Sequence, residues 1–371
     1  MKVVLDAHML GKQEGGNETY VAGLLAGLRD LALPDVAVTA LVDPGIPGGQ
    51  IPSWSGLGTH RLRSRGNLHR LLHGVGDACR LARADILHMT YHASFDLPCI
   101  LVLSVHDVLF KRFPAFFSPR DRLLLNTLLP LSIRRAARVL TLSEASRTDI
   151  EHFFPSARGR IDVIPLAAGS VVGAPPDLSA AREISGERSY ILAVGTIQPR
   201  KNFGRLVQAF GQLEKAKRGQ LRLVVVGKPQ WRSNQVRAAT GGDHGDVDVV
   251  FAGYVSDSAL AGLYRMCSAF VYPSLAEGFG LPVLEAMACG APVITSNVSS
   301  LVEVAGDAAL LVDPRSVGEI AGAMGRVLED PGLADELRDR GRQQALRFSW
   351  ANTARMTVEA YRRALNSRPA G

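Results

Sequence analysis

Nine residues, Glu277-Gly-Phe-Gly-Leu-Pro-Val-Leu-Glu285, carry the clearest structural pattern in this chain. They follow Ala269–Ser274, an apolar run that predicts a buried strand. Pro282 suits the first position of a helix, and Gly290 suits the position just past a helix end. We therefore expect a strand, a flexible loop and a helix that begins near Leu281. One carboxylate lies on the loop and the other in the first helical turn.

This loop and helix start suit a ligand that combines phosphate with sugar. Gly278 and Gly280 lack a Cβ, so their backbone can turn tightly and approach a ligand closely. Free N–H groups at the start of a helix favour a phosphate. Glu285 can accept two hydrogen bonds from the diol of a ribose, and Glu277 can reach a different polyhydroxylated group. A simpler interpretation stays open: Glu285 only complements the helix N-terminus, and Glu277 is an exposed loop acid.

A second loop carries two adjacent cations. The expected strand that ends at Gly195 is followed by Thr196-Ile-Gln-Pro-Arg-Lys-Asn202 and then by a helical pattern over 206–210. Parallel strands end at one edge of a sheet, where ligands bind. Arg200 as a planar fork and Lys201 as a point charge can offset the charge of a diphosphate. The alternative is a solvated loop pair.

Length and periodicity predict two α/β domains. The chain has 371 residues, 47% of them hydrophobic, and one core rarely extends beyond roughly 250–300 residues. In each half, short apolar runs alternate with helical or loop segments, which is typical of a doubly wound parallel sheet. We expect strands at 2–7, 36–42, 85–90, 100–106, 138–143 and 161–166, and again at 190–195, 221–227, 247–253, 269–274, 292–296 and 309–313. Gly and Pro in 167–177 indicate a linker that we interpret as a hinge, with domains over 1–170 and 186–349.

Two features of the first half extend the candidate site. Gly15 and Gly16 precede an apolar pattern that predicts a helix, and such a pair admits a phosphate or sugar close to the backbone. His106 ends an expected strand, where its ring can hydrogen-bond a sugar hydroxyl or a phosphate oxygen. A purely structural role for His106 is the alternative. Ser143 is expected to cap the helix that follows it.

Together, the Glu277 and Glu285 pair in an E-x7-E arrangement, the Gly-Gly-x-x-x-Tyr element from Gly15 and the His at 106 resemble retaining glycosyltransferases with the GT-B fold, specifically glycosyltransferase family 4. The resemblance implies two Rossmann-like domains facing across a cleft, the first on the acceptor side and the second binding the nucleotide sugar. It also implies that a final helix, about 350–371, packs back on the first domain.

The resemblance further assigns roles to residues. It implies that Glu285 binds the nucleotide ribose, that Glu277 and His106 contact the donor sugar, and that the backbone from Phe279 to Val283 contacts sugar and phosphate. The donor-binding set expected from the residues and the resemblance together is Gly15, Gly16, Gly195, Thr196, Arg200, Lys201, Glu277, Gly278, Phe279, Gly280, Leu281, Pro282, Val283 and Glu285. His106, Glu277, Arg200 and Lys201 are the candidate catalytic residues, with Glu277 orienting the donor sugar.

The resemblance implies sugar transfer with retention of anomeric configuration, by same-face attack in which the departing phosphate takes the acceptor proton. Here Thr196 stands where many family members carry Arg, and the variant Gly-Thr-x-x-Pro-Arg-Lys-Asn resembles a subgroup rich in mannosyltransferases acting on bacterial surface polysaccharides. We therefore expect GDP-mannose and a saccharide or lipid-linked saccharide acceptor, with UDP-glucose or UDP-N-acetylglucosamine next. A sugar-nucleotide epimerase or hydrolase, and a non-catalytic relative, remain alternatives. No metal or other cofactor is expected.

Composition and the absence of certain motifs exclude several partners and enzyme classes. The net charge of +7 is spread over both halves without a nucleic-acid-binding motif, so nucleic acid is not expected. No apolar run approaches the roughly 20 residues of a membrane span, and the N-terminus is typical of a short strand, so we expect a cytoplasmic protein. The four cysteines lie in apolar segments without a CxxC pair, which predicts buried thiols and no zinc site. No Rossmann or Walker glycine motif follows a suitable strand, which argues against a dehydrogenase or kinase.

One segment mixes aromatic and basic side chains. Residues 109–117 contain four Phe with Lys111 and Arg112, and the basic residues continue at Arg120, Arg122, Arg134 and Arg135. Such a surface can rest peripherally on anionic lipid and present a lipid-linked acceptor. The alternative is ordinary helix packing with solvated arginines.

Overall fold

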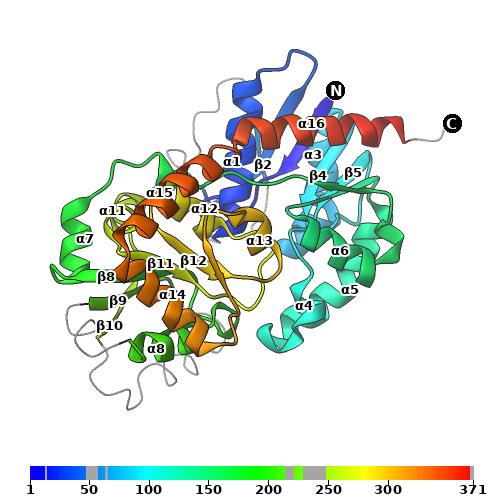
Figure 1. The fold of residues 1–371 in the computed structure, drawn as a ribbon. Helices are drawn as coiled ribbons and strands as arrows, with labels where there is room; N and C mark the ends of the chain where they lie inside the picture. Colours follow the sequence, from blue (N-terminus) through cyan, green and yellow to red (C-terminus); the bar gives the residue numbers. More distant parts are fainter. Residues whose placement is uncertain (13–14, 47–56, 63–65, 214–220, 229–247, 368–371) are drawn as a thin grey trace. The chain divides into compact units, whose positions relative to one another are not determined.

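The computed structural model describes residues 1–371 except 13–14, 47–56, 63–65, 214–220, 229–247 and 368–371. The chain forms two compact units (Figure 1). The first comprises residues 1–112, 119–167 and 349–371, and the second comprises residues 113–118 and 168–348. Residue 247, at the start of one expected strand, lies outside the described residues.

The first unit is built on a seven-stranded parallel sheet in the order β3-β2-β1-β4-β5-β6-β7. Its strands are β1 (Lys2–Asp6), β2 (Ala37–Val42), β3 (Gly58–Arg61), β4 (Ile86–Thr90), β5 (Ile100–Ser104), β6 (Arg138–Thr141) and β7 (Ile161–Val163). The sequence pattern missed β3, because Gly-Thr-His-Arg has no apolar alternation and forms a largely exposed edge strand. Strand order changes direction between β1 and β4, where open α/β sheets place their ligands.

Eight helical segments accompany this sheet among the described residues of the first unit, besides one short 3₁₀ turn at Pro155–Ala157. They are α1 (Gly16–Leu31), α2 (Asn67–His69), a π-helical segment (Arg70–Gly74), α3 (Val75–Ala82), α4 (Leu109–Arg112), α5 (Pro119–Arg135), α6 (Glu144–Phe153) and α16 (Trp350–Asn366). The Ser143 side chain caps α6 by accepting a hydrogen bond from the Ser146 N–H at 3.1 Å, which confirms the predicted cap.

Helix α16 packs closely on α1 within the first unit (Figure 1). A Cβ added to Gly27 would lie 2.3 Å from the carbonyl oxygen of Trp350, so only a glycine allows this approach of the two backbones. Gly23 lies under the indole ring of the same tryptophan. The Thr353 hydroxyl also donates to the Pro165 carbonyl at 2.7 Å. The last helix is therefore part of the core of the first unit.

The second unit is built on a six-stranded parallel sheet in the order β10-β9-β8-β11-β12-β13. Its strands are β8 (Ser189–Val194), β9 (Leu221–Val226), β10 (Val249–Gly253), β11 (Ala269–Tyr272), β12 (Val293–Ser296) and β13 (Leu310–Val312). All six match expected strands to within two residues at each end. This sheet also changes direction, between β8 and β11.

The helices of the second unit follow the strands in alternation. They are α7 (Leu178–Ser185), α8 (Phe203–Gly211), α11 (Asp257–Met266), α12 (Leu281–Ala288), α13 (Ser300–Ala305), α14 (Val317–Glu329) and α15 (Pro331–Ala345). Helix α12 begins at Leu281 as expected, with Gly280 as its N-cap and Pro282 at its second position. The expected linker carries a 3₁₀ turn at Ser170–Val172, and Asp177 caps α7.

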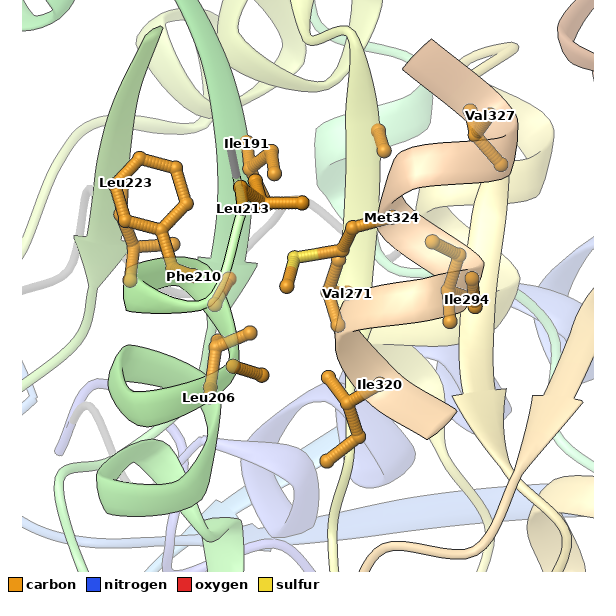
Figure 2. Close-up of a cluster of buried hydrophobic side chains, with 14 of the residues drawn as sticks. Ile191, Leu206, Phe210, Leu213, Leu223, Val271, Ile294, Ile320, Met324 and Val327 are labelled. Carbon is orange, nitrogen blue, oxygen red and sulfur yellow. The ribbon is translucent and has the colours of Figure 1, made fainter. Parts of the chain in front are cut away.

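An apolar core joins this sheet to α8 and α14 (Figure 2). Phe210 on α8 and Met324 on α14 meet Ile191, Leu223 and Val271 from three neighbouring strands, and all five are fully buried. Fully burying a side chain of this kind contributes about 1.5–3 kcal/mol. The strands beneath are thereby held rigid, and their carboxyl ends carry the loops that follow.

Candidate active site

The two loops singled out by sequence meet at the carboxyl edge of the second sheet. Because β8 and β11 are neighbours and parallel, the segments that follow them emerge side by side. The carboxylate of Glu277 is paired with both cations: Arg200 Nη1 lies 2.5 Å from Oε2, and Lys201 Nζ lies 2.7 Å from Oε1. Lys201 and Glu277 are each under 9% exposed. Glu277 is therefore not an exposed loop acid, and Arg200 and Lys201 are not a solvated pair.

The sequence around Arg200 explains how this loop is held. A 3₁₀ turn over Pro199–Lys201 ends at Asn202, whose backbone is left-handed with φ of 61°. The Asn202 amide donates to the carbonyls of Pro273 at 3.0 Å and Pro314 at 2.6 Å, both in other loops of the same edge. The Leu275 N–H donates to the Arg200 carbonyl at 2.9 Å. Asparagine is suited to this place because it tolerates φ above zero and can bond two backbones.

Tyr272 belongs to the same cluster, although the sequence pattern presented it only as part of a strand. Its hydroxyl hydrogen-bonds Lys201 Nζ and donates to Glu277 Oε1 at 3.1 Å. Lys201 Nζ also lies 4.8 Å from the centre of the Tyr272 ring. Burial opposes charge on Glu277, but Arg200 and Lys201 outweigh it and lower the pKa of this carboxyl to about 2. The cluster therefore holds two cations against one anion and has a net positive charge.

Two serines fix the backbone of Glu277. The Glu277 N–H donates to Ser299 Oγ at 3.0 Å, and the hydroxyls of Ser299 and Ser300 donate to its carbonyl at 3.0 and 2.9 Å. Ser299 adopts a φ of 48°, which is uncommon outside glycine. Serine pairs are too common for a sequence pattern to have found this contact.

Glu285 lies apart from the hydrogen bonds of this cluster, in the second turn of α12. It is the fifth residue of the helix, so the expectation that it lies in the first turn is wrong. The helix begins at Leu281 as expected, and a turn holds only 3.6 residues, so the fifth residue lies just past the first turn. Burial raises the pKa of Glu285 to about 7. A backbone hydrogen bond from Gly169 and one from the Tyr264 hydroxyl at 3.4 Å act in the opposite direction but are weaker.

The remaining predicted donor-binding residues of the second unit surround this edge. Gly278 to Gly280 form the loop that leads into α12, where Leu281, Pro282 and Val283 are the first helical residues. The Phe279 ring packs edge-on against Phe348 at 5.9 Å, so this side chain anchors the loop. Thr196 follows Gly195 at the end of β8, and its hydroxyl accepts from the Gln198 amide at 3.0 Å.

His106 follows β5 in the first unit and is held by α1. Its Nδ1 lies 2.9 Å from Asn17 Oδ1, and its ring meets the edges of Tyr20 at 4.6 Å and Tyr91 at 5.6 Å. Because an amide oxygen only accepts, Nδ1 carries the proton and Nε2 presents a lone pair. Nε2 is buried and has no hydrogen-bond partner among the described residues. Burial lowers the pKa of His106 to about 4, so the ring is neutral at pH 7.

Comparison with known proteins identifies the family of this chain. A family model for glycosyl transferases group 1 matches residues 176–344, and one for a glycosyl transferase 4-like domain matches residues 15–167. The O-antigen chain mannosyltransferase B of Escherichia coli is 35% identical over 303 residues, 79% of each chain. The chain belongs to the group 1 glycosyltransferases of family 4.

Further relatives agree with this family and its fold. The serotype-specific mannosyltransferase WbdA of Escherichia coli is 34% identical over 63% of this glycosyltransferase and 29% of its own length. Sucrose-phosphate synthase from Thermosynechococcus elongatus superposes with a TM-score of 0.75 at 22% identity, covering 99% of this chain and 100% of that one. Anabaena HepE in complex with UDP-glucose gives 0.73 at 19% identity, covering 98% and 99%. This glycosyltransferase has the GT-B fold, as expected from the sequence.

The glycosyltransferase brings its predicted residues together in two sets. Arg200, Lys201 and Glu277 form one cluster in the second unit, with Glu285 on the neighbouring helix. His106 belongs to the first unit. Gly15 is the N-cap of α1 and Gly16 its first residue, directly before Asn17 and one turn before Tyr20, which hold His106.

A buried polar chain, which no sequence pattern predicted, lies behind His106. The Tyr361 hydroxyl on α16 contacts His88 Nδ1 at 2.6 Å, His88 Nε2 contacts Ser104 Oγ at 2.7 Å, and Ser104 Oγ contacts the Tyr20 hydroxyl at 2.7 Å. Burial lowers the pKa of His88 to about 3. In the sequence, His88 and Ser104 are visible only as polar residues within apolar strands, and that pattern does not reveal their hydrogen-bond partners.

A second missed cluster lies at the carboxyl end of β1. Arg70 pairs with Asp6, and His8 Nδ1 lies 3.0 Å from the same carboxylate. Despite burial, Arg70 and His8 lower the pKa of Asp6 to about 2. Arg70 Nε and His92 Nδ1 are buried without a hydrogen-bond partner in the described part of the chain. Arg70 and Asp6 are 64 positions apart, so only the fold reveals the pair.

Three remaining expectations concern metals, thiols and membrane spans. Across the described residues, no group of three or more His, Cys, Asp or Glu is arranged to hold a metal ion. None of the four cysteines forms a disulfide; Cys79 and Cys267 are buried as predicted, while Cys99 and Cys289 are half-buried. Within the described ranges, no helix is long and apolar enough to cross a membrane.

Proposed function

We propose that this glycosyltransferase transfers mannose from GDP-mannose to a saccharide or lipid-linked saccharide acceptor, with retention, in the synthesis of a cell-surface polysaccharide. The observation that carries the proposal is the buried, net-positive cluster of Arg200, Lys201 and Glu277 next to the N-terminus of α12. The mannose assignment is supported by the similarity to O-antigen chain mannosyltransferase B over 79% of both chains. In this proposal the second unit binds the donor and the first binds the acceptor.

The cluster supplies the electrostatic part of the reaction. When the bond between the sugar C1 and the diphosphate oxygen breaks, the electron pair leaves with the diphosphate. In this proposal, Arg200, Lys201 and the positive end of α12 stabilise that charge. The acceptor oxygen forms its bond to C1 on the same face, and its proton passes to the departing phosphate oxygen.

Glu277 orients groups in this proposal and does not attack the sugar. Its pKa of about 2 keeps it ionised, and its two oxygens already hold Arg200 and Lys201. An ionised carboxylate has lone pairs left to accept a hydrogen bond from a sugar hydroxyl. On the first unit, the free lone pair of His106 Nε2 suits the same task.

Glu285 binds the ribose in this proposal. Two donated hydrogen bonds from a diol are best accepted by the ionised carboxylate. Because the pKa of Glu285 is raised to about 7, binding at neutral pH must release part of a proton. Donor affinity should therefore rise as the pH increases through 7.

Calorimetric titration of GDP-mannose, UDP-glucose and UDP-N-acetylglucosamine tests the proposal, with the wild type and Glu285→Ala, without divalent metal. The proposal expects binding of GDP-mannose that is lost in the variant, with proton release measurable in buffers of different ionisation enthalpy. Preference for a UDP-sugar would show that the donor is not GDP-mannose, while the proposed donor site would stand. Binding that survives Glu285→Ala would remove the ribose assignment. Conversion of the nucleotide sugar without an acceptor product would favour an epimerase or hydrolase.

A further inference from the structure

The outward face of α5 has the opposite polarity to that of an ordinary surface helix. Such a helix turns its apolar stripe to the core and its charged residues to water. In α5, Leu123, Leu124 and Leu131 are 67%, 46% and 51% exposed. Its buried residues are Leu129, Ser132 and Ile133, on the other side. Core packing therefore does not explain the exposed leucines.

The exposed side chains form a stripe that begins and ends in arginine. Arg120, Leu124, Thr127, Leu131 and Arg134 are spaced by four and three residues, so they share one face of the helix, and all five are exposed. The two arginines are roughly 20 Å apart along the axis. Apolar side chains flanked by cations are typical of a helix that lies in the interface of a membrane.

The apolar surface continues from α5 onto two neighbouring segments. The Arg135 guanidinium donates to the carbonyls of Ser94 at 2.8 Å and Phe95 at 2.9 Å, which holds Phe95 beside the C-terminal end of α5. The Phe95 N–H donates to the Leu71 carbonyl at 2.8 Å, next to Leu72. In the described part of the first unit, every large hydrophobic side chain classed as exposed lies between residues 68 and 131: Leu68, Leu72, Leu81, Phe95, Leu123, Leu124 and Leu131. The hydrogen bonds of Arg135 and Phe95 hold Phe95 and the backbone next to Leu72 near α5, which extends its exposed apolar surface, and large exposed apolar patches mark binding surfaces.

The positive charge of α5 indicates which partner this surface binds. Helix α5 carries Arg120, Arg122, Arg134 and Arg135 against the single acid Asp121. A second copy of the chain meeting this stripe about a two-fold axis would set arginine against arginine, whether the two helices ran parallel or antiparallel. A negatively charged lipid bilayer attracts the arginines, and its acyl boundary can also bury the leucines.

We propose that the exposed stripe of α5, together with Phe95, Leu68 and Leu72, binds the surface of an anionic lipid bilayer. The helix lies parallel to that surface, with its leucines in the acyl boundary and its arginines among the headgroups. This inference goes beyond the proposed function, because it holds whichever sugar is transferred. It would bring a lipid-linked acceptor and the enzyme to one surface.

Co-sedimentation of the full-length protein with vesicles tests the inference. The vesicles are phosphatidylcholine alone, and phosphatidylcholine mixed with phosphatidylglycerol. Binding is expected only to the anionic vesicles and should weaken as salt rises. Leu124→Ser/Leu131→Ser should weaken it at least about tenfold, because two apolar side chains no longer leave water. Arg120→Gln/Arg134→Gln should weaken it about fivefold for each arginine removed.

Leu346→Ser is the matched control, since Leu346 is 76% exposed at the end of α15 in the second unit and should leave binding unchanged. Circular dichroism and donor calorimetry show whether each variant is folded and still binds nucleotide sugar, which separates this inference from the proposed function. Three results would overturn it: no binding to anionic vesicles, equal binding to both vesicle types, or binding unaffected by the leucine substitutions. Self-association of the wild type that the leucine substitutions abolish would assign the surface to a second copy instead.

Discussion

The hydroxyl of Tyr361 lies 2.6 Å from Nδ1 of His88, a residue 273 positions earlier in the chain. Through His88 and Ser104 this contact reaches the hydroxyl of Tyr20, whose ring packs on His106. The C-terminal helix therefore supports the candidate catalytic histidine, although it does not touch it.

Tyr361→Phe should lower the stability of the first unit by about 1–3 kcal/mol, because it leaves Nδ1 of buried His88 without its partner. It should also reduce kcat/KM several-fold by loosening Tyr20 against His106. Urea unfolding and steady-state kinetics measure the two effects. Tyr190→Phe is the matched control: this buried hydroxyl donates to the Leu263 carbonyl at 2.8 Å in the second unit, so stability should fall with little change in kcat/KM. Equal kinetic effects in both variants would contradict a specific role for Tyr361.

Glu277→Gln should cost about 3–5 kcal/mol of unfolding free energy, because the ion pairs with buried Lys201 and half-buried Arg200 lose their negative partner. The control is Glu336→Gln on α15, which breaks an exposed pair with Arg340 and should cost under about 1 kcal/mol. Denaturant unfolding at pH 7 measures both. The difference in unfolding free energy between the wild type and Glu277→Gln should shrink as pH falls from about 4.5 towards 2, because the folded-state pKa of Glu277 is lowered to about 2. A cost that does not change over that range would mean that ion pairing is not its source.

Glu285→Gln should have the opposite pH dependence. The folded-state pKa of Glu285 is raised to about 7, so the protonated carboxyl is favoured by folding, and this stabilisation is lost as pH rises from about 4.5 through 7. Glutamine keeps a neutral side chain at every pH. The variant should match the wild type near pH 5 and exceed its stability by about 1–3 kcal/mol at pH 8. Urea titrations at the two pH values make the comparison, and a variant less stable at pH 8 would show that the ionised carboxylate is well solvated or paired.

Glu285→Ala and Lys201→Ala should differ in kinetics. Loss of a ribose contact made equally in ground and transition state raises the donor KM and leaves kcat nearly unchanged. Loss of Lys201 removes a charge that matters most as the diphosphate departs, so kcat should fall about 10²-fold or more. Initial rates over a range of donor concentrations separate the two parameters. Small and equal effects from both substitutions would reject this division of roles.

Sequence was sufficient for the parts of the molecule in which local pattern and tertiary environment agree. Strands such as β8 and β11 are continuous apolar runs because both of their faces are covered, and the turn residues around them mark their ends. The exposed edge strand β3 lacks that pattern and was missed. Helix α12 begins at Leu281 as expected, and Glu285, its fifth residue, lies just past the first turn of 3.6 residues.

The site was predictable in its charged residues and not in their supports. Arg200, Lys201 and Glu277 stand out as charges beside buried strands. Tyr272, Ser299 and Asn202 act through distances that depend on β8 lying next to β11 and on loops up to 112 residues apart. Their residue types occur throughout the chain, so no single-sequence pattern separates them from the rest.

The packing of Trp350 against Gly23 and Gly27 has a consequence for biosynthesis. Residues 168–348 leave the ribosome before α16 does, and α16 is a core element of the first unit. The second unit can complete its folding during translation, while the first must wait with one side of α1 uncovered until the last helix emerges. In this enzyme the N-terminal half is the later of the two to mature, and nascent chains stalled before Trp350 should expose α1 to chaperones and proteases.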